Sequence, residues 1–231
     1  MFDPVAAAPG SDTVFNVNRR SREMPTPTEK FSQALRDKAA VFGIQLSADD
    51  VRRLCNYYEL LLKWNERLHL VAPCSPEEFA TRHVLESLLL LTRLSQNARV
   101  VDVGPGAGLP IIPCLILRAD LRATLIESSP RKGVFLREAL RYVNTLVPAA
   151  LTIARFEDTD PPEADFVTCR ALDRFQQVLP TLVEWAPTTS ALLLFAGEEL
   201  RQQIEILLPN AKAERIPLSE RRYLIIAGLD S

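Results

Sequence analysis

A glycine-rich turn interrupts an apolar run near the middle of the chain, in the segment VVDVGPGAGLP at residues 100–110. Gly104, Gly106 and Gly108 alternate with other residues, so a ligand can approach the main chain closely there. A dinucleotide-binding loop has the spacing G-x-G-x-x-G, and Leu109 stands where its third glycine would be. The lysine of a nucleoside triphosphate loop does not follow either, so the turn indicates a different ligand.

Two acidic residues near this turn bear on the class of ligand, and one of them, Asp102, narrows it. Asp102 precedes the first glycine by two residues, which suits a ligand with an ammonium or sulfonium group better than a pyrophosphate. Glu127 ends the next apolar run, at the position typical of an acid that binds ribose hydroxyls. Nicotinamide cofactors use the same contact, so the choice of ligand rests on the glycine spacing and Asp102. We therefore predict S-adenosylmethionine as the cofactor, bound by Asp102, the three glycines, Leu109 and Glu127. In the structural alternative, the glycines only form a tight turn and Glu127 only caps the following helix.

The rest of the chain supplies the elements that must position this turn. From residue 29 to about 94 the pattern is helical, with capping boxes at residues 47–50 and 75–78, so three helices precede any strand. After residue 97, short β-branched runs alternate with helical stretches, which predicts a parallel sheet with right-handed crossovers. The expected strands are 98–103, 122–127, 149–153, 164–169 and 190–195, followed by an antiparallel hairpin from 211–217 and 222–228.

These elements predict an α/β fold, Rossmann-like, of the class I S-adenosylmethionine-dependent methyltransferase type, with a helical N-terminal cap. Its parts are a flexible tail at residues 1–28, the helical cap at 29–96 and the cofactor-binding methyltransferase domain at 97–231. The net charge of −2 and the lack of a long apolar run indicate a cytoplasmic protein without a membrane span or secretory signal. Four scattered cysteines and two histidines support neither a disulfide framework nor a zinc site. We expect no metal, no membrane partner and a monomer.

Six stretches of the chain carry a family resemblance: LLKWNERLHLVAP, TRHVLESLLLL, VVDVGPGAGLPIIPCLIL, LIESSPRKGVFLREAL, ARFED and DFVTCRAL. Over roughly residues 50–200 and in this order, they resemble the bacterial small-subunit ribosomal RNA methyltransferases historically called glucose-inhibited division protein B. The resemblance implies methylation of a guanine N7 in 16S ribosomal RNA, either free or within a small-subunit intermediate. Two departures bear on activity: Pro105 replaces the usual serine, and Ala196 replaces the lysine of a Lys-Gly pair.

This substrate determines which residues the chemistry needs. Guanine N7 attacks with a lone pair and loses no proton, so orientation and electrostatic stabilisation suffice without a general base. Arg170, directly after the fourth expected strand, is the predicted catalytic and substrate-binding residue, because a guanidinium can grip guanine O6 or a phosphate. The alternative role for Arg170 is an ion pair with a nearby acid.

The remaining candidate residues follow other strands. Phe156 and Glu157 are expected beside the adenine ring of the cofactor. Arg155, Arg131 and Lys132 are expected to meet RNA, although Arg155 can equally cap the site and the other two can open a solvated helix. Since the chain has no basic excess, any RNA contact must be a local patch. Two alternatives stay open: a methyltransferase of a small molecule or protein, and a cofactor-binding module without activity.

Overall fold

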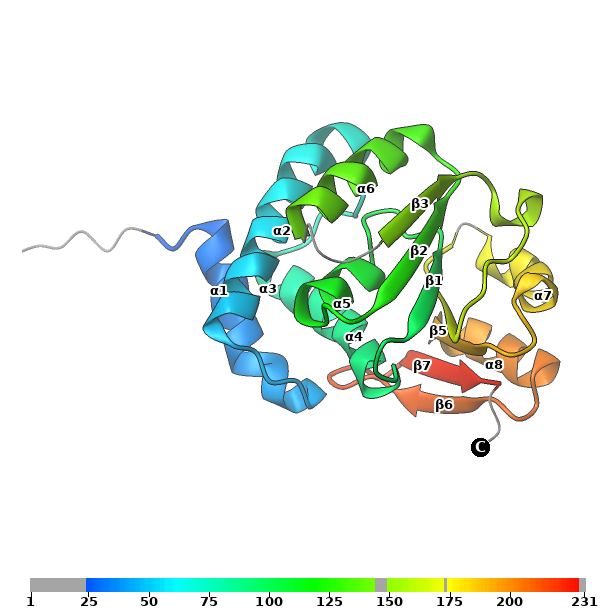
Figure 1. The fold of residues 1–231 in the computed structure, drawn as a ribbon. Coiled ribbons are helices and arrows are strands. Elements are labelled where there is room, and N and C mark those ends of the chain that lie inside the picture. The colour runs from blue at the N-terminus through cyan, green and yellow to red at the C-terminus, as the bar shows by residue number, and fades with distance from the viewer. Residues whose placement is uncertain (1–23, 144–148, 173, 229–231) are drawn as a thin grey trace, which may run out of the picture.

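The computed structural model describes residues 24–143, 149–172 and 174–228, and within them seven strands form one sheet (Figure 1). The strand order is β3-β2-β1-β4-β5-β7-β6. The strands are β1 Arg99–Val103, β2 Arg122–Glu127, β3 Ala149–Ile153, β4 Phe166–Arg170, β5 Ala191–Gly197, β6 Lys212–Arg215 and β7 Arg222–Ala227. Strands β1 to β5 pair in parallel, and β7 pairs antiparallel with both β5 and β6. The mostly parallel sheet and the closing hairpin are confirmed.

The helices cover both faces of the sheet. They are α1 Pro27–Lys38, α2 Ala48–Leu68, α3 Pro76–Glu78, α4 Glu86–Leu88, α5 Ile111–Leu117, α6 Pro130–Val143, α7 Phe175–Trp185 and α8 Glu198–Leu207. Shorter turns are η1 Ala39–Phe42, the π-helical η2 Phe79–Leu85, η3 Leu89–Thr92 and η4 Phe156–Asp158. In Figure 1, α2, α5 and α6 lie on one side of the sheet, and α7 and α8 lie on the other.

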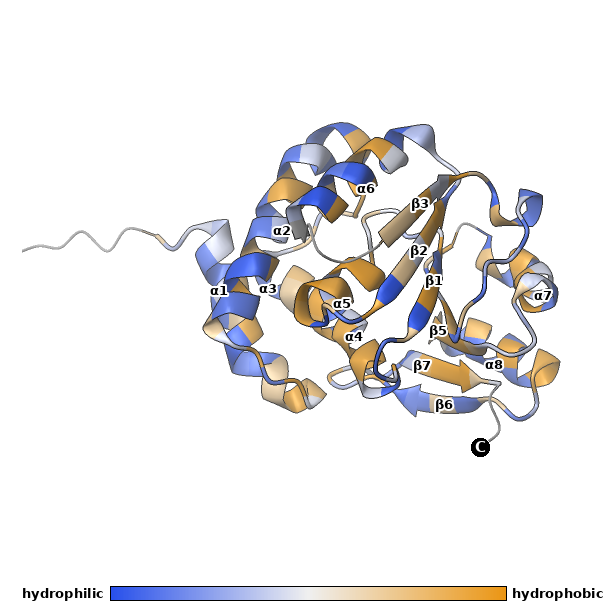
Figure 2. Ribbon diagram, viewed as in Figure 1, coloured by the Kyte–Doolittle hydropathy of each residue, from blue (hydrophilic) through white to orange (hydrophobic). Residues whose placement is uncertain are grey.

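Side-chain alternation in the strands explains this layering. Val100 of β1 packs with the cap helices, α5 and α6, whereas Val101 and Val103 pack with α7 and α8. Figure 2 shows α5 as mostly hydrophobic, which agrees with its burial between sheet and cap. Strand β6 is polar and fully exposed, as an edge strand that resists pairing with other chains should be.

The cap contains the three helical stretches that the sequence predicts, with changes at their ends. Helix α1 begins at Pro27, two residues before the expected start, because Thr26 and Glu29 form a capping box that the sequence reading missed. The box from Ser47 to Asp50 is present. Ser75 accepts a hydrogen bond from the Glu78 main-chain nitrogen, but no reciprocal bond forms among the described residues. The predicted tail lies, for residues 1–23, outside the described part of the chain.

Candidate active site

The glycine turn lies at the carboxyl end of β1, where α/β sheets bind ligands. Gly104, Gly106 and Gly108 have φ values of +68°, +54° and +82°, in the left-handed region that favours glycine. A Cβ added to Gly104 would overlap the Leu172 side chain. The carbonyl oxygen of Pro105 accepts hydrogen bonds from the Gly108 and Leu109 nitrogens, at 2.8 and 3.1 Å. Pro105 therefore contributes an acceptor to this turn, for which its missing N–H is no obstacle.

Glu127 holds the glycine turn from the neighbouring strand. It is 4% exposed, and its Oε2 accepts a hydrogen bond from the Gly106 nitrogen at 3.0 Å. Its Oε1 accepts one from the Ser129 nitrogen at 2.8 Å. Since a carboxylate has about four lone-pair positions, Glu127 keeps acceptor capacity beyond these two bonds. The carboxylate thus organises the turn.

Asp102 is fully buried in β1. Its Oδ2 accepts a hydrogen bond from the Ile111 nitrogen at 3.3 Å, at the start of α5. Its Oδ1 has no hydrogen-bond partner among the described residues. Burial raises the pKa of Asp102 well above its usual range, and the nearby Glu127 carboxylate adds to this effect. A buried acceptor without a donor is costly, which makes this oxygen a candidate for a ligand contact.

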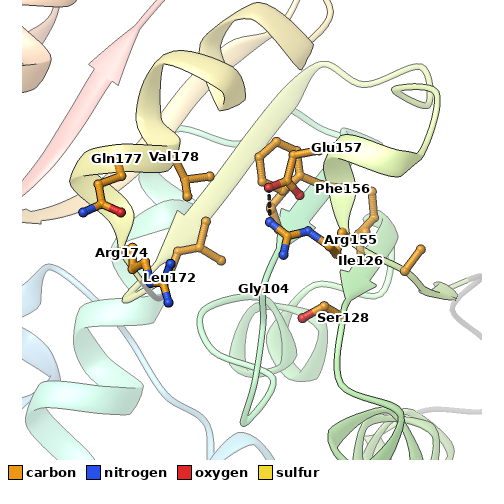
Figure 3. A pocket seen from close by; sticks show the side chains of 12 residues that line it. Gly104, Ile126, Ser128, Arg155, Phe156, Glu157, Leu172, Arg174, Gln177 and Val178 are labelled. Carbon is orange, nitrogen blue, oxygen red and sulfur yellow. Dashed lines mark hydrogen bonds and ion pairs between the residues drawn. The ribbon is translucent and has the colours of Figure 1, made fainter.

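A cavity of about 310 Å³ opens beside the glycine turn (Figure 3). In the figure, Leu172, Arg174, Gln177 and Val178 lie on one side of it, and Arg155, Phe156 and Glu157 lie on the other. Its lining consists of Val103, Gly104, Ile126, Ser128, Ala154, Arg155, Phe156, Glu157, Leu172, Arg174, Gln177 and Val178. Thus Gly104, Phe156 and Glu157 of the predicted cofactor set line one cavity.

An aromatic contact and an ion pair stabilise the cavity wall at η4. Phe156 is buried and packs edge to face against Trp185, with ring centroids 5.4 Å apart. Arg155 pairs with Glu157 at 2.8 Å between Nη2 and Oε1, which raises the pKa of Arg155. Asp102, Glu127, Gly106, Gly108 and Leu109 are not part of the lining; they form the turn and the layer behind it.

Arg170 ends β4 and enters a network of buried charges. Its side chain is 14% exposed, and its Nη2 lies 3.0 Å from Oε2 of Glu86, which is itself 1% exposed. Nη2 also donates to the Arg82 carbonyl oxygen, and Nη1 donates to Ser87 Oγ at 3.3 Å. The other Glu86 oxygen accepts from Nε and Nη2 of Arg222, at 3.0 and 2.6 Å. The alternative role foreseen for Arg170, an ion pair, is therefore present.

A second cavity, of about 580 Å³, lies beside this network. Its lining is Arg82, His83, Glu86, Arg170, Ala171, Arg174, Phe175, Gln176, Gln177, Phe195, Ala196, Gly197, Leu200, Ile216 and Arg222. Arg170 stacks over Phe195, with its Cζ 5.1 Å from the ring centroid. Arg174 and Gln177 line both cavities, so the two are adjacent. Sequence reasoning missed Arg174, whose position four residues after the end of β4 was the available signal.

The other predicted RNA-contacting residues lie on the surface at the start of α6. Arg131 is exposed and its Nη2 donates to the Arg67 carbonyl oxygen at 3.5 Å. Lys132 is half-buried, and its main-chain nitrogen lies 3.4 Å from Ser129 Oγ. Neither residue lines the two cavities. Their contact with RNA stays a prediction.

Replacing Gly104 by alanine is expected to weaken S-adenosylmethionine binding roughly tenfold, about 1.4 kcal/mol. The new methyl group would displace Leu172 from the cavity wall, and the left-handed φ would also be strained. Gly43 is a matched control, because it has a φ of +69° but no atom within 4 Å of an added Cβ. Urea unfolding should show a stability loss from backbone strain in both variants, larger in Gly104→Ala because of the overlap with Leu172, and calorimetric titration should show a loss of affinity only for Gly104→Ala. Equal affinities would contradict the placement of the cofactor.

His83 gives the protein a predictable pH dependence. Burial, and then the charges of Arg170 and Arg82, lower the pKa of His83 from 6.5 to about 4. Between these values the unfolded chain binds a proton that the folded chain does not, so stability is complete above about pH 6.5 and falls as pH drops toward 4. We expect the free energy of unfolding to be roughly 2 kcal/mol lower at pH 5 than at pH 7, from ~1.36 kcal/mol per pKa unit. In urea titrations, His83→Gln should remove most of this difference in unfolding free energy between pH 5 and pH 7. If the difference is unchanged in the variant, groups other than His83 cause it.

The described residues contain neither a membrane-spanning helix nor a cluster of metal-ligating side chains. None of the described helices is long and apolar enough to cross a membrane. Within residues 24–143, 149–172 and 174–228, no three His, Cys, Asp or Glu side chains are grouped to hold a metal ion.

Comparison with known proteins decides the family. The model of the family described as rRNA small subunit methyltransferase G matches residues 50–218. The chain belongs to this family. Among curated members of the rRNA small subunit methyltransferase G family, the protein of Xanthomonas campestris pv. campestris strain B100 is 37% identical over 192 residues, covering 80% of this chain and 90% of the relative. The Sorangium cellulosum protein is 32% identical over 186 residues, covering 78% and 76%.

Solved structures support the fold. Mitomycin 7-O-methyltransferase MmcR superimposes with a TM-score of 0.54 at 15% identity, covering 89% of this chain and 74% of that one. The ribosomal protein L11 methylase of Lactobacillus delbrueckii subsp. bulgaricus gives 0.51 at 16% identity, covering 64% and 78%. The predicted class I methyltransferase fold is therefore confirmed.

Proposed function

We propose that this protein transfers a methyl group from S-adenosylmethionine to N7 of a guanine in 16S ribosomal RNA. The observation that carries the proposal is the pair of adjacent cavities that share Arg174 and Gln177. The first cavity adjoins the glycine turn, which suits the methyl donor. The second cavity is lined by more arginines than carboxylates, which suits a nucleic-acid acceptor. The relatives named as ribosomal RNA small subunit methyltransferases supply the substrate class.

The residues around the first cavity fit S-adenosylmethionine. Gly104 leaves room at the wall that a side chain would fill, and Gly106, Gly108 and Leu109 complete the turn. We assign the ribose hydroxyls to the remaining lone pairs of Glu127 and the cofactor's amine end to the unpartnered oxygen of Asp102. The adenine ring would lie against Phe156 and Glu157. When bound, the cofactor supplies an electrophilic methyl group on a sulfonium.

Methylation of guanine N7 does not require a side chain that takes up or releases a proton. Guanine N7 carries its lone pair in the plane of the base, so the protein has to align that atom and exclude water. His83 lines the second cavity, but its pKa of about 4 makes it a weak base near neutral pH. Alignment therefore falls to the cavity walls, the arginines and the rigid strand ends.

Arg170 is proposed to act on the substrate from the boundary of the second cavity. Its Nη2 is occupied by Glu86 and the Arg82 main chain, whereas Nη1 bonds to Ser87 through one hydrogen. The second Nη1 hydrogen has no partner among the described residues, and we assign it to a guanine or phosphate oxygen of the substrate. We further propose that Arg131, Lys132 and Arg155 contact RNA phosphates, that the protein acts as a monomer, and that it works in the cytoplasm, where ribosomal subunits assemble.

The test compares cofactors and acceptors on one preparation. Calorimetric titration should give binding of S-adenosylmethionine and none of NAD. Methyl transfer is then measured to free 16S ribosomal RNA, to small-subunit particles and to total cell protein. Transfer to guanine N7 of the RNA supports the proposal. Binding without transfer to any acceptor would instead indicate a cofactor-binding module, and transfer to protein alone would indicate the other alternative.

A further inference from the structure

The second cavity has a surplus of positive charge and an apolar interior. Four arginines and a single carboxylate are among its lining residues. Phe175 and Phe195 are both buried in its wall, beside Leu200 and Ile216. Apolar walls with cations at the rim are suited to a base that has left its stack and to the phosphates attached to it.

The four arginines differ in whether they form an ion pair with a carboxylate. Arg170 and Arg222 share the buried carboxylate of Glu86, and Arg82 pairs with Glu78. Arg174 is exposed, and its side chain forms no ion pair or hydrogen bond with the residues that the structure describes. Its complete guanidinium fork therefore remains open for a two-point contact with an anion.

The backbone at Arg174 is also unusual. Its φ is +50°, in the left-handed region. A residue other than glycine or asparagine raises the conformational free energy there by roughly 1–2 kcal/mol. Folding alone would favour glycine or asparagine at this position. Arg174 is the N-cap residue directly before α7 and lies between the two cavities, so the strain accompanies a position where donor and acceptor meet.

We propose that Arg174 binds a phosphate of the acceptor nucleotide and thereby holds that nucleotide between the two cavities, with its base in the second. This inference rests on the proposed function, because it takes RNA as the methyl acceptor. Arg174 is then a substrate-binding residue at the boundary of the cofactor cavity, and its main effect is on RNA affinity.

The experiment uses two variants of Arg174 and one control. Arg174→Asn removes the charge but tolerates the left-handed backbone, and Arg174→Lys keeps the charge but loses the fork. Lys212→Asn removes an exposed charge from edge strand β6, which is outside both cavities. Each protein is assayed for methyl transfer to small-subunit particles, for RNA affinity at several salt concentrations, and for S-adenosylmethionine affinity.

We expect Arg174→Asn to raise KM for the RNA about tenfold and to reduce the slope of log affinity against log salt by about one. Arg174→Lys should retain the salt slope with a smaller rise in KM, and Lys212→Asn should match the wild type. S-adenosylmethionine affinity should fall less than RNA affinity in the two Arg174 variants, because Arg174 is one of several residues that line the first cavity, and should stay at the wild-type value in Lys212→Asn. Unchanged RNA affinity and salt slope in Arg174→Asn, or a loss confined to cofactor binding, would overturn the inference. If the wild type binds RNA but transfers no methyl group, the proposed function fails, and the salt slope still decides the role of Arg174.

Discussion

Replacing Glu86 by alanine is expected to lower the free energy of unfolding by about 3–5 kcal/mol. The Glu86 carboxylate is 1% exposed and receives Arg170 on one oxygen and Arg222 on the other. Its removal leaves two partly buried guanidinium groups without their counter-charge, and the cost of an uncompensated buried charge exceeds the value of the lost contacts. The network joins α4 to the ends of β4 and β7, so the loss should loosen the cap from the sheet.

A matched exposed pair provides the control for this prediction. Glu214 pairs with Arg93 on the surface, and such pairs contribute roughly 0–1 kcal/mol. Urea unfolding of Glu86→Ala and Glu214→Ala at pH 7 should therefore give a large loss for the first and almost none for the second. Similar small losses in both would mean that the Glu86 network contributes little to the fold.

Replacing Glu127 by alanine is expected to weaken S-adenosylmethionine binding by about 1–3 kcal/mol, which is the usual cost of leaving a polar group unpaired. Two effects add: the Gly106 and Ser129 nitrogens lose their acceptor, and the ribose hydroxyls lose theirs. Glu127→Gln retains one carbonyl oxygen, so its affinity should fall between those of the wild type and the alanine variant. Calorimetric titration measures all three.

Stability measurements separate the two effects in Glu127→Ala. If only the turn is disturbed, the free energy of unfolding and the affinity should fall together in the alanine and glutamine variants. If Glu127 also contacts the ribose, affinity should fall further than the unfolding free energy accounts for. An affinity equal to that of the wild type in Glu127→Ala would remove Glu127 from the cofactor site.

The sheet could be predicted from the sequence because its signals are local. Strands β2 and β3 lie at the predicted residues, since β-branched runs bounded by turns specify strands without reference to the rest of the chain. The glycine turn was equally local, because three left-handed positions require three glycines. The position of Glu127 at the end of β2 was predictable because folds of this type commonly carry an acid at the end of the second strand.

The charge network could not be predicted in this way. Glu86 and Arg222 are 136 residues apart. The strand order β4-β5-β7 places Arg170 and Arg222 in the same part of the sheet, and the packing of α4 adds Glu86 to them. The place of Arg174 between two cavities likewise depends on the conformation of the segment after β4, for which the sequence carries no motif. The burial of Asp102 behind the turn also arises from tertiary packing, since its spacing from Gly104 suggested only that the carboxylate lies near the ligand.

Mass spectrometry of 16S ribosomal RNA nucleosides is the decisive measurement for the proposed methylation of a guanine. Small-subunit RNA is prepared from cells with the protein, from cells lacking it, and from the latter supplied with wild-type protein or with Glu127→Ala. We predict that 7-methylguanosine falls in the absence of the protein, returns with the wild type, and returns less with the variant. An equal content of 7-methylguanosine with and without the protein would show that it does not methylate guanine N7 in this RNA.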